Sequence, residues 1–197
     1  MLDCHDGIPV QPDLDDILTT NESKKIIDLC LERGANLNRI LTESKREKGF
    51  DTHQINITYY EALGKNDDAY IAARAIQFFA PGIPQVYYVG LLAGENDLLG
   101  VESTGEGRAI NRENFSIAGI SEALQKDVVQ RLIWLIRFRN SHPAFGGKLT
   151  TLESNDKNVL IRWESGSQFC ELIMSLENYL SEIRFSNDLG EIMHHSV

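Results

Sequence analysis

Residues 67–90 read DDAYIAARAIQFFAPGIPQVYYVG, and this stretch decides the expected fold class. Two acidic residues at its start are good N-cap candidates for a helix over Ala69–Phe79. The two prolines and the glycine that follow cannot continue that helix. The β-branched and aromatic run Gln85–Gly90 then predicts a strand that is buried on both faces. Because a helix, a short turn and a buried strand form half of a βαβ repeat, the stretch predicts an α/β fold with a parallel sheet.

Further helices are expected on both sides of this stretch. Apolar residues recur at near-helical spacing over Asp15–Arg33, and Gly34 is a plausible stop. A broad apolar face predicts a long helix over about Lys126–Asn140. Between them, the polar and basic run Asn36–Gly49 is typical of a solvated surface loop. The run Gly49–Asn56 mixes one aromatic with short polar side chains, which favours a loop with a polar function over a core element.

The pattern changes near the C-terminus. From Leu149 onward, short alternating segments at 158–163, 169–175 and 182–185 are separated by Gly and Asn turn signals. This pattern predicts a small antiparallel β-sheet domain over residues 148–197. The pair His194–His195 follows the last of these segments, and we expect a frayed terminus there and no metal site, since no further ligands are evident.

Composition excludes several classes of partner. The 197 residues include 19 Lys and Arg against 29 Asp and Glu, so the formal net charge is −10. This balance opposes binding to a phosphate backbone, and we expect no nucleic-acid partner. We expect no membrane partner either, because no stretch approaches the roughly 20 apolar residues of a membrane helix. The chain is long enough to bury a sizeable core, but it is short of the about 250 residues typical of a (β/α)8 enzyme.

The cysteines and the first residues bear on location. Cys4, Cys30 and Cys170 are odd in number and far apart, without a metal-binding cluster, so we expect reduced thiols. A signal peptide would have a basic segment followed by an apolar run, and the start of this chain has no such pattern. Together these features predict a cytoplasmic protein.

Three polar clusters stand where catalytic loops are expected in parallel α/β folds, beyond the carboxyl ends of strands. They are His5–Asp6, Asp51–Gln54, and Arg108 with Asn111–Arg112. An Asp beside a His can hold sugar hydroxyls, because a carboxylate accepts hydrogen bonds and an imidazole can donate one. Its charge would also stabilise an oxocarbenium ion during glycosyl transfer. The alternative is that Asp6 only caps the backbone of its own turn.

Four stretches of the chain resemble the sucrose phosphorylases of glycoside hydrolase family 13, in the alpha-amylase superfamily. The stretches are Met1–Ile8, Asp51–Gly64, Ile71–Gly90 and Gly107–Arg112. The resemblance extends from Met1 to about Phe145 and fades in the C-terminal β region. Several long motifs in the same order make chance an unsatisfactory explanation.

The resemblance implies the C-terminal part of a (β/α)8 TIM barrel. The end of strand seven would lie at Met1–Asp6, an inserted excursion at about residues 7–61, and strand eight at Gln85–Gly90, with helices seven and eight after these two strands. Residues 1–147 would then form an incomplete catalytic barrel, ahead of the antiparallel β domain at 148–197.

The resemblance also implies a reaction, that of a retaining hexosyltransferase in carbohydrate metabolism. In that family a carboxylate displaces fructose from sucrose and forms a β-glucosyl-enzyme, and inorganic phosphate then captures the sugar as α-glucose 1-phosphate. The implied small-molecule partners are sucrose, inorganic phosphate, glucose 1-phosphate and fructose. No metal or organic cofactor takes part.

Site residues follow from the matching motifs. Asp6 matches the aspartate that stabilises the transition state, and His5 matches the histidine that hydrogen-bonds the glucosyl hydroxyls. Arg108 matches the arginine at the far edge of the glucosyl ring. Asp51 and Gln54 fall in the loop that meets fructose in one state and makes room for phosphate in another.

Two residues keep open roles. His53 stands where many relatives have a tyrosine, and a partly protonated imidazole there would attract phosphate or a phosphorylated acceptor. The alternative for His53 is a neutral loop residue. Arg112 is equally compatible with a structural ion pair and with a contact to ligand.

A retaining mechanism needs a nucleophilic carboxylate and a general acid about 5 Å apart. By resemblance, the family's nucleophile Asp and acid/base Glu lie on barrel strands upstream of Met1. We therefore expect this chain to be the C-terminal fragment of such an enzyme, from a truncated or split reading frame, and to be inactive alone. A missing N-terminal barrel portion or a homodimer would complete it. The alternatives are a noncatalytic sugar-binding or interaction module, and a phosphorylase of the same family that acts on sucrose 6-phosphate.

Overall fold

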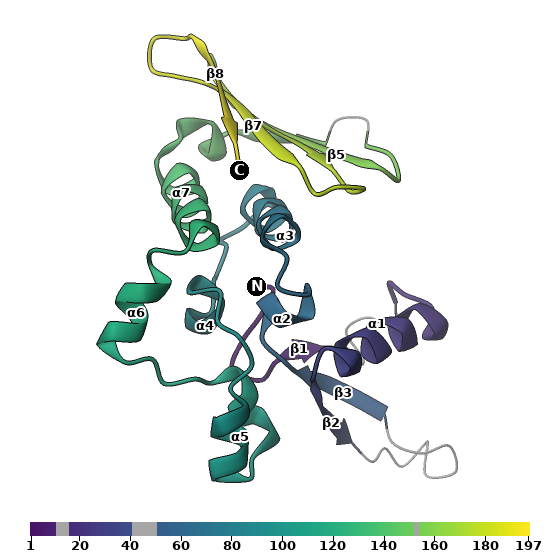
Figure 1. Cartoon of the computed structure of the whole chain (residues 1–197). Helices are drawn as coiled ribbons and strands as arrows, with labels where there is room; N and C mark the ends of the chain where they lie inside the picture. Colours follow the sequence, from purple (N-terminus) through teal and green to yellow (C-terminus); the bar gives the residue numbers. More distant parts are fainter. Residues whose placement is uncertain (11–15, 41–50, 152–153) are drawn as a thin grey trace. The chain divides into compact units, whose positions relative to one another are not determined.

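The computed structural model describes residues 1–10, 16–40, 51–151 and 154–197, with the backbone alone at 37–40 and 51–53 (Figure 1). The described chain divides into two compact units. The first unit comprises residues 1–65 and 85–123, and the second comprises residues 66–84 and 124–197. The predicted domain boundary after residue 147 stays a prediction.

The first unit combines a small antiparallel sheet with short helices. Its sheet has the order β1-β3-β2. The elements are β1 (Ile8–Pro9), α1 (Thr20–Glu32), β2 (Asn36–Ile40), β3 (Asp51–Asn56), α2 (Tyr59–Ala62), α4 (Tyr88–Leu91), α5 (Leu98–Thr104), the 3-10 helix η2 (Gly107–Asn111) and α6 (Ile117–Ala123).

Helix α1 confirms the helix predicted in this part of the chain, and its ends have local causes. Thr19 and Glu22 form a capping box, in which each side chain bonds the backbone N–H of the other residue. After Arg33 the chain turns at Gly34, whose φ of +85° is unfavourable for a residue with a Cβ. The helix therefore begins at Thr20 and ends at Glu32.

Strand β3 replaces the loop that polar composition predicted at Gly49–Asn56. Ile55 at the end of the strand is fully buried, together with Ile57 just after it. Both belong to a core cluster with Val10, Cys30 and Ala35. The loop prediction was wrong because a strand alternates its faces, so that polar residues on one face are compatible with apolar anchors on the other. Strand β2 likewise occupies the start of the segment that was predicted as a surface loop.

The strand predicted at Gln85–Gly90 is not formed. Tyr87 is extended, but Tyr88–Leu91 form one turn of helix α4. Met1–Asp6 also contributes no strand, only an isolated bridge between Cys4 and Gly7. Neither segment lies in one of the two described sheets, and both sheets are antiparallel. A segment of high β propensity still needs a neighbouring strand to receive its backbone hydrogen bonds.

The second unit packs two long helices with a five-stranded antiparallel meander of order β4-β5-β6-β7-β8. The elements are α3 (Asp67–Phe79), α7 (Asp127–Ser141), the 3-10 helix η3 (Pro143–Gly146), β4 (Lys148–Thr151), β5 (Asn158–Ser165), β6 (Gln168–Ser175), β7 (Ser181–Ser186) and β8 (Ile192–Ser196). Both helices and the β-sheet domain were predicted from the sequence. The N-cap of α3 is Asn66, whose side chain accepts from the Ala69 N–H at 2.9 Å; the predicted acidic residues occupy its first turn.

Buried polar contacts fix the sheet to its surroundings in the second unit. The indole N–H of Trp163 donates to the carbonyl of Phe79 at 2.8 Å. On β6, the buried carboxylate of Glu171 lies between Arg162 at 3.7 Å and Arg184 at 2.5 Å, its cross-strand neighbours in register. These contacts select one register for β5, β6 and β7, since a one-residue slip would move the charges to the opposite face.

The terminal histidines are ordered in β8, so the frayed terminus predicted there was wrong. The imidazole of His195 stacks on Trp134 with ring centroids 3.6 Å apart, and His194 contacts Glu182 on the neighbouring strand. Pairing with β7 holds this end of the chain. Among the helices of the described residues, none has the length and apolar character needed to cross a membrane.

Candidate functional site

The predicted His5–Asp6 pair occupies a tight turn. The Gly7 N–H donates to the Cys4 carbonyl at 3.1 Å, and the Asp6 N–H donates to the Cys4 sulfur at 3.4 Å. Gly7 has φ of +93°, and a Cβ built on it would lie 2.2 Å from the Ile55 carbonyl oxygen. The turn therefore requires glycine at this position, both for its backbone conformation and for its approach to β3.

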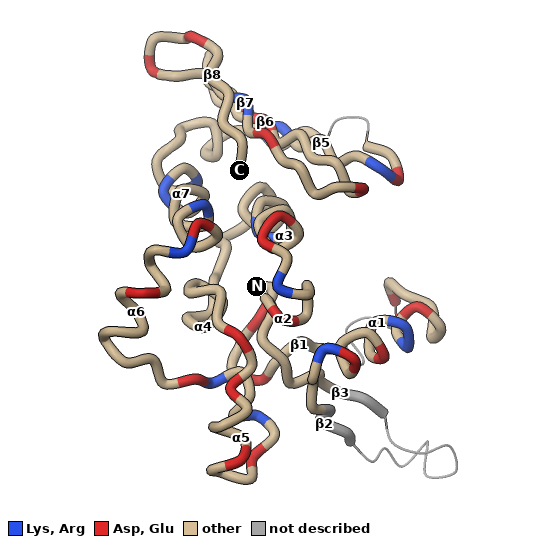
Figure 2. The backbone as a smooth tube through the Cα atoms, in the orientation of Figure 1, with Lys and Arg blue, Asp and Glu red and all other residues tan. Residues whose placement is uncertain are grey.

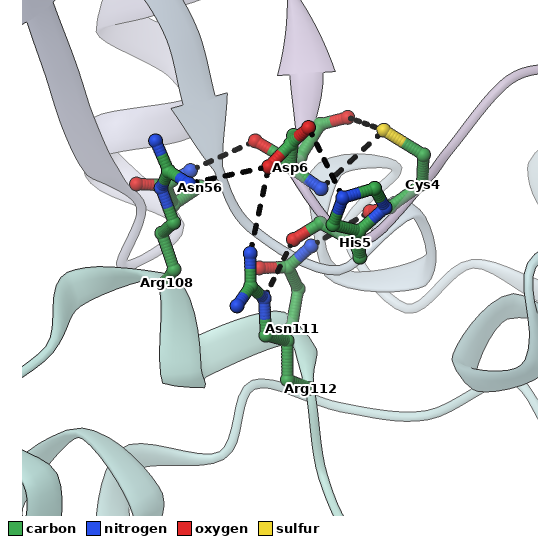
Figure 3. A network of polar contacts seen from close by, with 8 residues as sticks. Cys4, His5, Asp6, Asn56, Arg108, Asn111 and Arg112 are labelled. Atoms are coloured by element: carbon green, nitrogen blue, oxygen red, sulfur yellow. Dashed lines mark hydrogen bonds and ion pairs between the residues drawn. The ribbon is translucent and has the colours of Figure 1, made fainter.

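Three cationic or polar groups converge on the Asp6 carboxylate (Figure 3). Arg108 Nη1 and Arg112 Nη2 each lie 3.4 Å from Oδ1, and His5 Nε2 lies 3.3 Å from Oδ2. The Asp6 side chain is about one-third exposed, at 31%. An accessible carboxylate oxygen can accept a hydroxyl hydrogen bond from a ligand.

The backbone of the turn has its own set of donors. Asn111 Nδ2 donates to the Cys4 carbonyl at 2.9 Å, and Arg112 Nε donates to the His5 carbonyl at 2.8 Å. Asn56 Nδ2 donates to the Asp6 carbonyl at 3.0 Å. Three successive carbonyls are thus bonded by side chains that come from β3 and from the end of η2 (Figure 3).

Segment η2 is itself tied to the rest of the first unit. Its Ile110 is fully buried, and the Ile110 carbonyl accepts from the Asp97 N–H at 2.8 Å. The Asn36 side chain on β2 reaches the Gly107 carbonyl at 3.4 Å. These contacts place Arg108 and Arg112 on a fixed support instead of a free loop.

A hollow of ≈ 600 Å³ opens beside the turn. Its lining residues are Met1, Cys4, His5, Asp6, Gln85, Val86 and Tyr87. Burial, reinforced by a hydrogen bond with Tyr88, raises the pKa of Tyr87 well above its ordinary value. Its phenol therefore stays protonated at neutral pH, next to a space large enough for a monosaccharide.

The structure brings together His5, Asp6 and Arg108, as the polar-cluster argument expects. Gln54 lies on β3 two residues before Asn56, hence on the same face of the strand. The side chains of Asp51 and His53 lie outside the described residues, so their predicted roles stay predictions. Arg112 bonds the His5 backbone and the Asp6 carboxylate, which is the structural contact of the two predicted alternatives; its contact to ligand stays a prediction.

The specific roles of Asn56 and Asn111 were not predicted. Asn111 stands in a polar cluster that the sequence singled out and Asn56 lies two positions beyond another, but an asparagine there has no signature of its own. Both are buried at 3% exposure, and the side-chain amide of each donates a hydrogen bond to a carbonyl of the turn. The two hydrogen bonds join residues that are 50 and 107 positions apart in the sequence, so they can be recognised only in the folded structure.

Cys4, His5 and Asp6 are also the one group among the described residues with metal-ligand character. Their sulfur, nitrogen and oxygen atoms lie within 4.8 Å of one another. However, the carboxylate already faces two guanidinium groups, whose charges would repel a divalent cation. The Cys4 sulfur is engaged with the turn backbone as well. The arrangement favours hydrogen bonding to a neutral polyol over metal binding.

The two arginines stand out against an acidic chain. Glu95, Asp97, Glu102 and Glu106 precede Arg108, and Figure 2 shows acidic residues along the α5 segment. The local excess of positive charge at Asp6 is therefore confined to the site itself. With one carboxylate between two guanidinium groups, the site keeps hydrogen-bond donors available for a ligand.

Comparison with known proteins finds relatives that are phosphorylases. The chain is 52% identical, over its whole length, to a sucrose 6(F)-phosphate phosphorylase from Thermoanaerobacterium thermosaccharolyticum. The chain is homologous to the sucrose phosphorylases. It is 42% identical over 89% of its length to the sucrose phosphorylase of Agrobacterium vitis, and 42% identical over 98% to a glucosylglycerol phosphorylase from Marinobacter adhaerens. No family model matches the chain.

A solved structure agrees with these sequence matches. The crystal structure of a sucrose 6F-phosphate phosphorylase from Thermoanaerobacter thermosaccharolyticum covers the whole chain with a TM-score of 0.96. The chain spans about 40% of that protein, and 41%, 40% and 37% of the three phosphorylases named above, in the order sucrose 6(F)-phosphate, glucosylglycerol and sucrose phosphorylase. It corresponds to a C-terminal portion of these phosphorylases.

Proposed function

We propose that this chain supplies the glucosyl-binding side of the active site of a retaining sucrose-type phosphorylase. In this proposal His5 and Arg108 hydrogen-bond the glucosyl hydroxyls, and the Asp6 carboxylate stabilises the positive charge that develops at the anomeric carbon. Asp51, His53 and Gln54 would contact fructose or phosphate. The barrel that completes the site would be a (β/α)8 TIM barrel, of which this chain forms the last part.

One observation carries the proposal. The His5 imidazole lies 3.3 Å and the Arg108 guanidinium 3.4 Å from oxygens of the Asp6 carboxylate, beside a hollow of ≈ 600 Å³. This arrangement occurs in a chain that is 52% identical to a phosphorylase of a glucoside. A preorganised anion with adjacent donors suits a transition state of oxocarbenium character.

The chemistry of the proposed reaction also limits this chain. A carboxylate attacks the anomeric carbon, the bond to the fructosyl oxygen breaks, and a general acid protonates that oxygen. A phosphate oxygen then attacks the glucosyl-enzyme and returns the carboxylate. Asp6 takes neither covalent role, and the nucleophile and the acid are expected outside these 197 residues. We therefore propose no phosphorolysis by the purified chain alone, with a separate N-terminal barrel portion or a homodimer as its completing partner.

The test measures binding and turnover separately. The purified chain is titrated with glucose and with sucrose while the amide resonances of His5 and Asp6 are followed by NMR, and glucose 1-phosphate is assayed in the same samples with phosphate added. We expect saturable shifts and no product. Product at a rate that survives removal of contaminants would overturn the proposed inactivity. A folded chain without saturable shifts would overturn the proposed binding role.

A phosphorylated sucrose is a second candidate for the substrate, favoured by the identity to a sucrose 6(F)-phosphate phosphorylase. His53 is the residue proposed to meet the phosphate, since an imidazole attracts anions when protonated. Titration with sucrose 6-phosphate and with sucrose, for the natural chain and for His53→Tyr, separates the two. We expect tighter binding of the phosphorylated sugar and loss of that preference in the variant; equal affinity of the natural chain for both sugars would contradict it.

A further inference from the structure

The turn from Cys4 to Gly7 carries the proposed site, and its conformation is not secured by a sheet. Only an isolated bridge joins its two ends. Carbonyls in such an exposed turn usually bond water, and the peptide planes between them can then rotate. Here side chains of the first unit take the place of that water.

Two of the three donors are neighbours at the end of η2 and the third lies on β3, and each reaches one carbonyl. Asn111 bonds the Cys4 carbonyl, Arg112 the His5 carbonyl and Asn56 the Asp6 carbonyl. Fixing three successive carbonyls fixes the peptide planes on both sides of His5 and of Asp6. The direction of each Cα–Cβ bond, and with it the placement of imidazole and carboxylate, is then set before any ligand arrives.

Arg108 and Arg112 make different contacts with this turn. Arg112 is anchored by its Nε on the His5 carbonyl, and its Nη2 reaches Asp6 Oδ1. Arg108 meets Asp6 through the carboxylate, at 3.4 Å, with its side chain 47% exposed. Arg112 therefore holds the backbone, while Arg108 can turn toward a ligand at the loss of one long ion pair.

The orientation of the Asn111 side-chain amide is determined by its role as a hydrogen-bond donor to the turn. Its Oδ1 is buried without a hydrogen-bond partner among the described residues, which is an unfavourable arrangement for an amide. Reversing the amide would place that oxygen against the Cys4 carbonyl oxygen and lose the one bond that the side chain makes. The amide thus leaves Oδ1 unpaired so that Nδ2 can donate to the Cys4 carbonyl.

We infer that Asn56, Asn111 and Arg112 are positioning residues, which hold the three carbonyls of the turn so that His5 and Asp6 face the hollow in a binding-competent geometry. The inference rests on the proposed function, because it concerns the same site. None of the three needs to touch the sugar. Their loss would loosen the turn first and weaken binding as a consequence.

Hydrogen exchange at the Gly7 amide tests this inference directly, since that N–H closes the turn on the Cys4 carbonyl. The variants are Asn111→Leu and Arg112→Met, which remove a donor, and Arg112→Gln, which keeps a neutral donor. Arg108→Met is the matched control, because it removes a guanidinium from Asp6 without touching a turn carbonyl. Exchange at Leu172 on β6 reports the second unit separately.

We expect Arg112→Met and Asn111→Leu to speed exchange at Gly7 by about tenfold, with Leu172 unchanged. Arg112→Gln should restore slow exchange, and Arg108→Met should leave it slow. Equal exchange rates in Arg112→Met and Arg108→Met would overturn the inference. Because Arg112 is partly exposed, its variants test the point even where Asn111→Leu fails to fold.

The saccharide titration then separates this inference from the proposed function. If the natural chain binds glucose, affinity should fall about tenfold in Arg112→Met and recover in Arg112→Gln. If the natural chain binds no saccharide, the proposed function fails, while the exchange data still decide whether these residues hold the turn. Full affinity in a chain whose Gly7 amide exchanges rapidly would show that the positioning has no bearing on binding.

Discussion

The turn at Cys4–Gly7 and the sheet β4–β8 are stabilised in opposite ways. The sheet satisfies its backbone through a continuous ladder of strand neighbours, and its side chains form the core with α3 and α7. The turn satisfies its backbone through side chains from distant positions. A ladder tolerates the loss of one side chain better than a turn held by single contacts does. The difference is that of a scaffold, which needs redundancy, and a site, which needs one fixed geometry.

Gly7→Ala should have the largest effect, because the backbone of the turn approaches β3 too closely at Gly7 to accommodate a side chain. The added Cβ would lie 2.2 Å from the Ile55 carbonyl oxygen, in addition to the strain of a positive φ. We expect a loss of about 3 kcal/mol or more in the free energy of unfolding of the first unit, measured by denaturant titration.

Gly105→Ala is the matched control for this substitution, because Gly105 belongs to the same unit. Gly105 also has a positive φ, of +70°, but nothing within 4 Å of the added Cβ. It should show only the conformational cost, of about 1–2 kcal/mol. Equal losses in the two variants would mean that the approach of the turn to β3 is not what requires glycine.

Glu171→Gln should have the next largest effect, and it should be confined to the second unit. The substitution removes the charge that Arg162 and Arg184 share across three strands. We expect a loss of about 2 kcal/mol in the free energy of unfolding, since the substitution leaves the two guanidinium groups without their buried counter-charge.

Glu164→Gln provides the comparison, because Glu164 meets Arg162 at 2.6 Å through a side chain that is 48% exposed. Its loss should stay below about 0.5 kcal/mol, as for other surface ion pairs. A cost for Glu164→Gln as large as that for Glu171→Gln would show that burial does not determine the contribution of the charge.

The smallest effect concerns pH. Burial of His195 against Trp134 lowers the pKa of its imidazole below the ordinary value of 6.5. The folded state therefore binds protons less readily than the unfolded state does, so this contribution is fully present above about pH 6.5 and is lost as the pH falls below it. Unfolding of the second unit, followed by Trp fluorescence from pH 7.5 to 5.5, should show the decline, and His195→Gln should reduce it. An identical pH profile in that variant would contradict this origin.

The scaffold was largely predictable from the sequence. Apolar spacing and capping residues predicted α1, α3 and α7, and short alternating segments between turn signals predicted the C-terminal sheet. These signals are local, because each depends on residues within a few positions of one another. Two predictions failed. Gln85–Gly90 has the composition of a strand but no strand neighbour within the described ranges, and β3 has polar residues that its alternation accommodates.

The site was predictable in part. The adjacent His5 and Asp6, with Arg108, were recognisable as candidates from residue chemistry and from the resemblance to a family. The support for them was not, because Asn56 and Asn111 act through single hydrogen bonds to carbonyls 50 and 107 positions away. Such contacts leave no periodic or compositional trace. They follow only from the folded arrangement of β3, η2 and the turn.

The central claim is that Asp6 anchors a glucosyl-binding site in this chain. Its most direct test is a titration with glucose, followed through the amide resonances of His5 and Asp6, for the natural chain and for Asp6→Asn. We predict saturable shifts in the natural chain and their loss in Asp6→Asn, with slow exchange at Gly7 retained in both. Identical saturable shifts in the two chains, or no saturable shift in a folded natural chain, would contradict the claim.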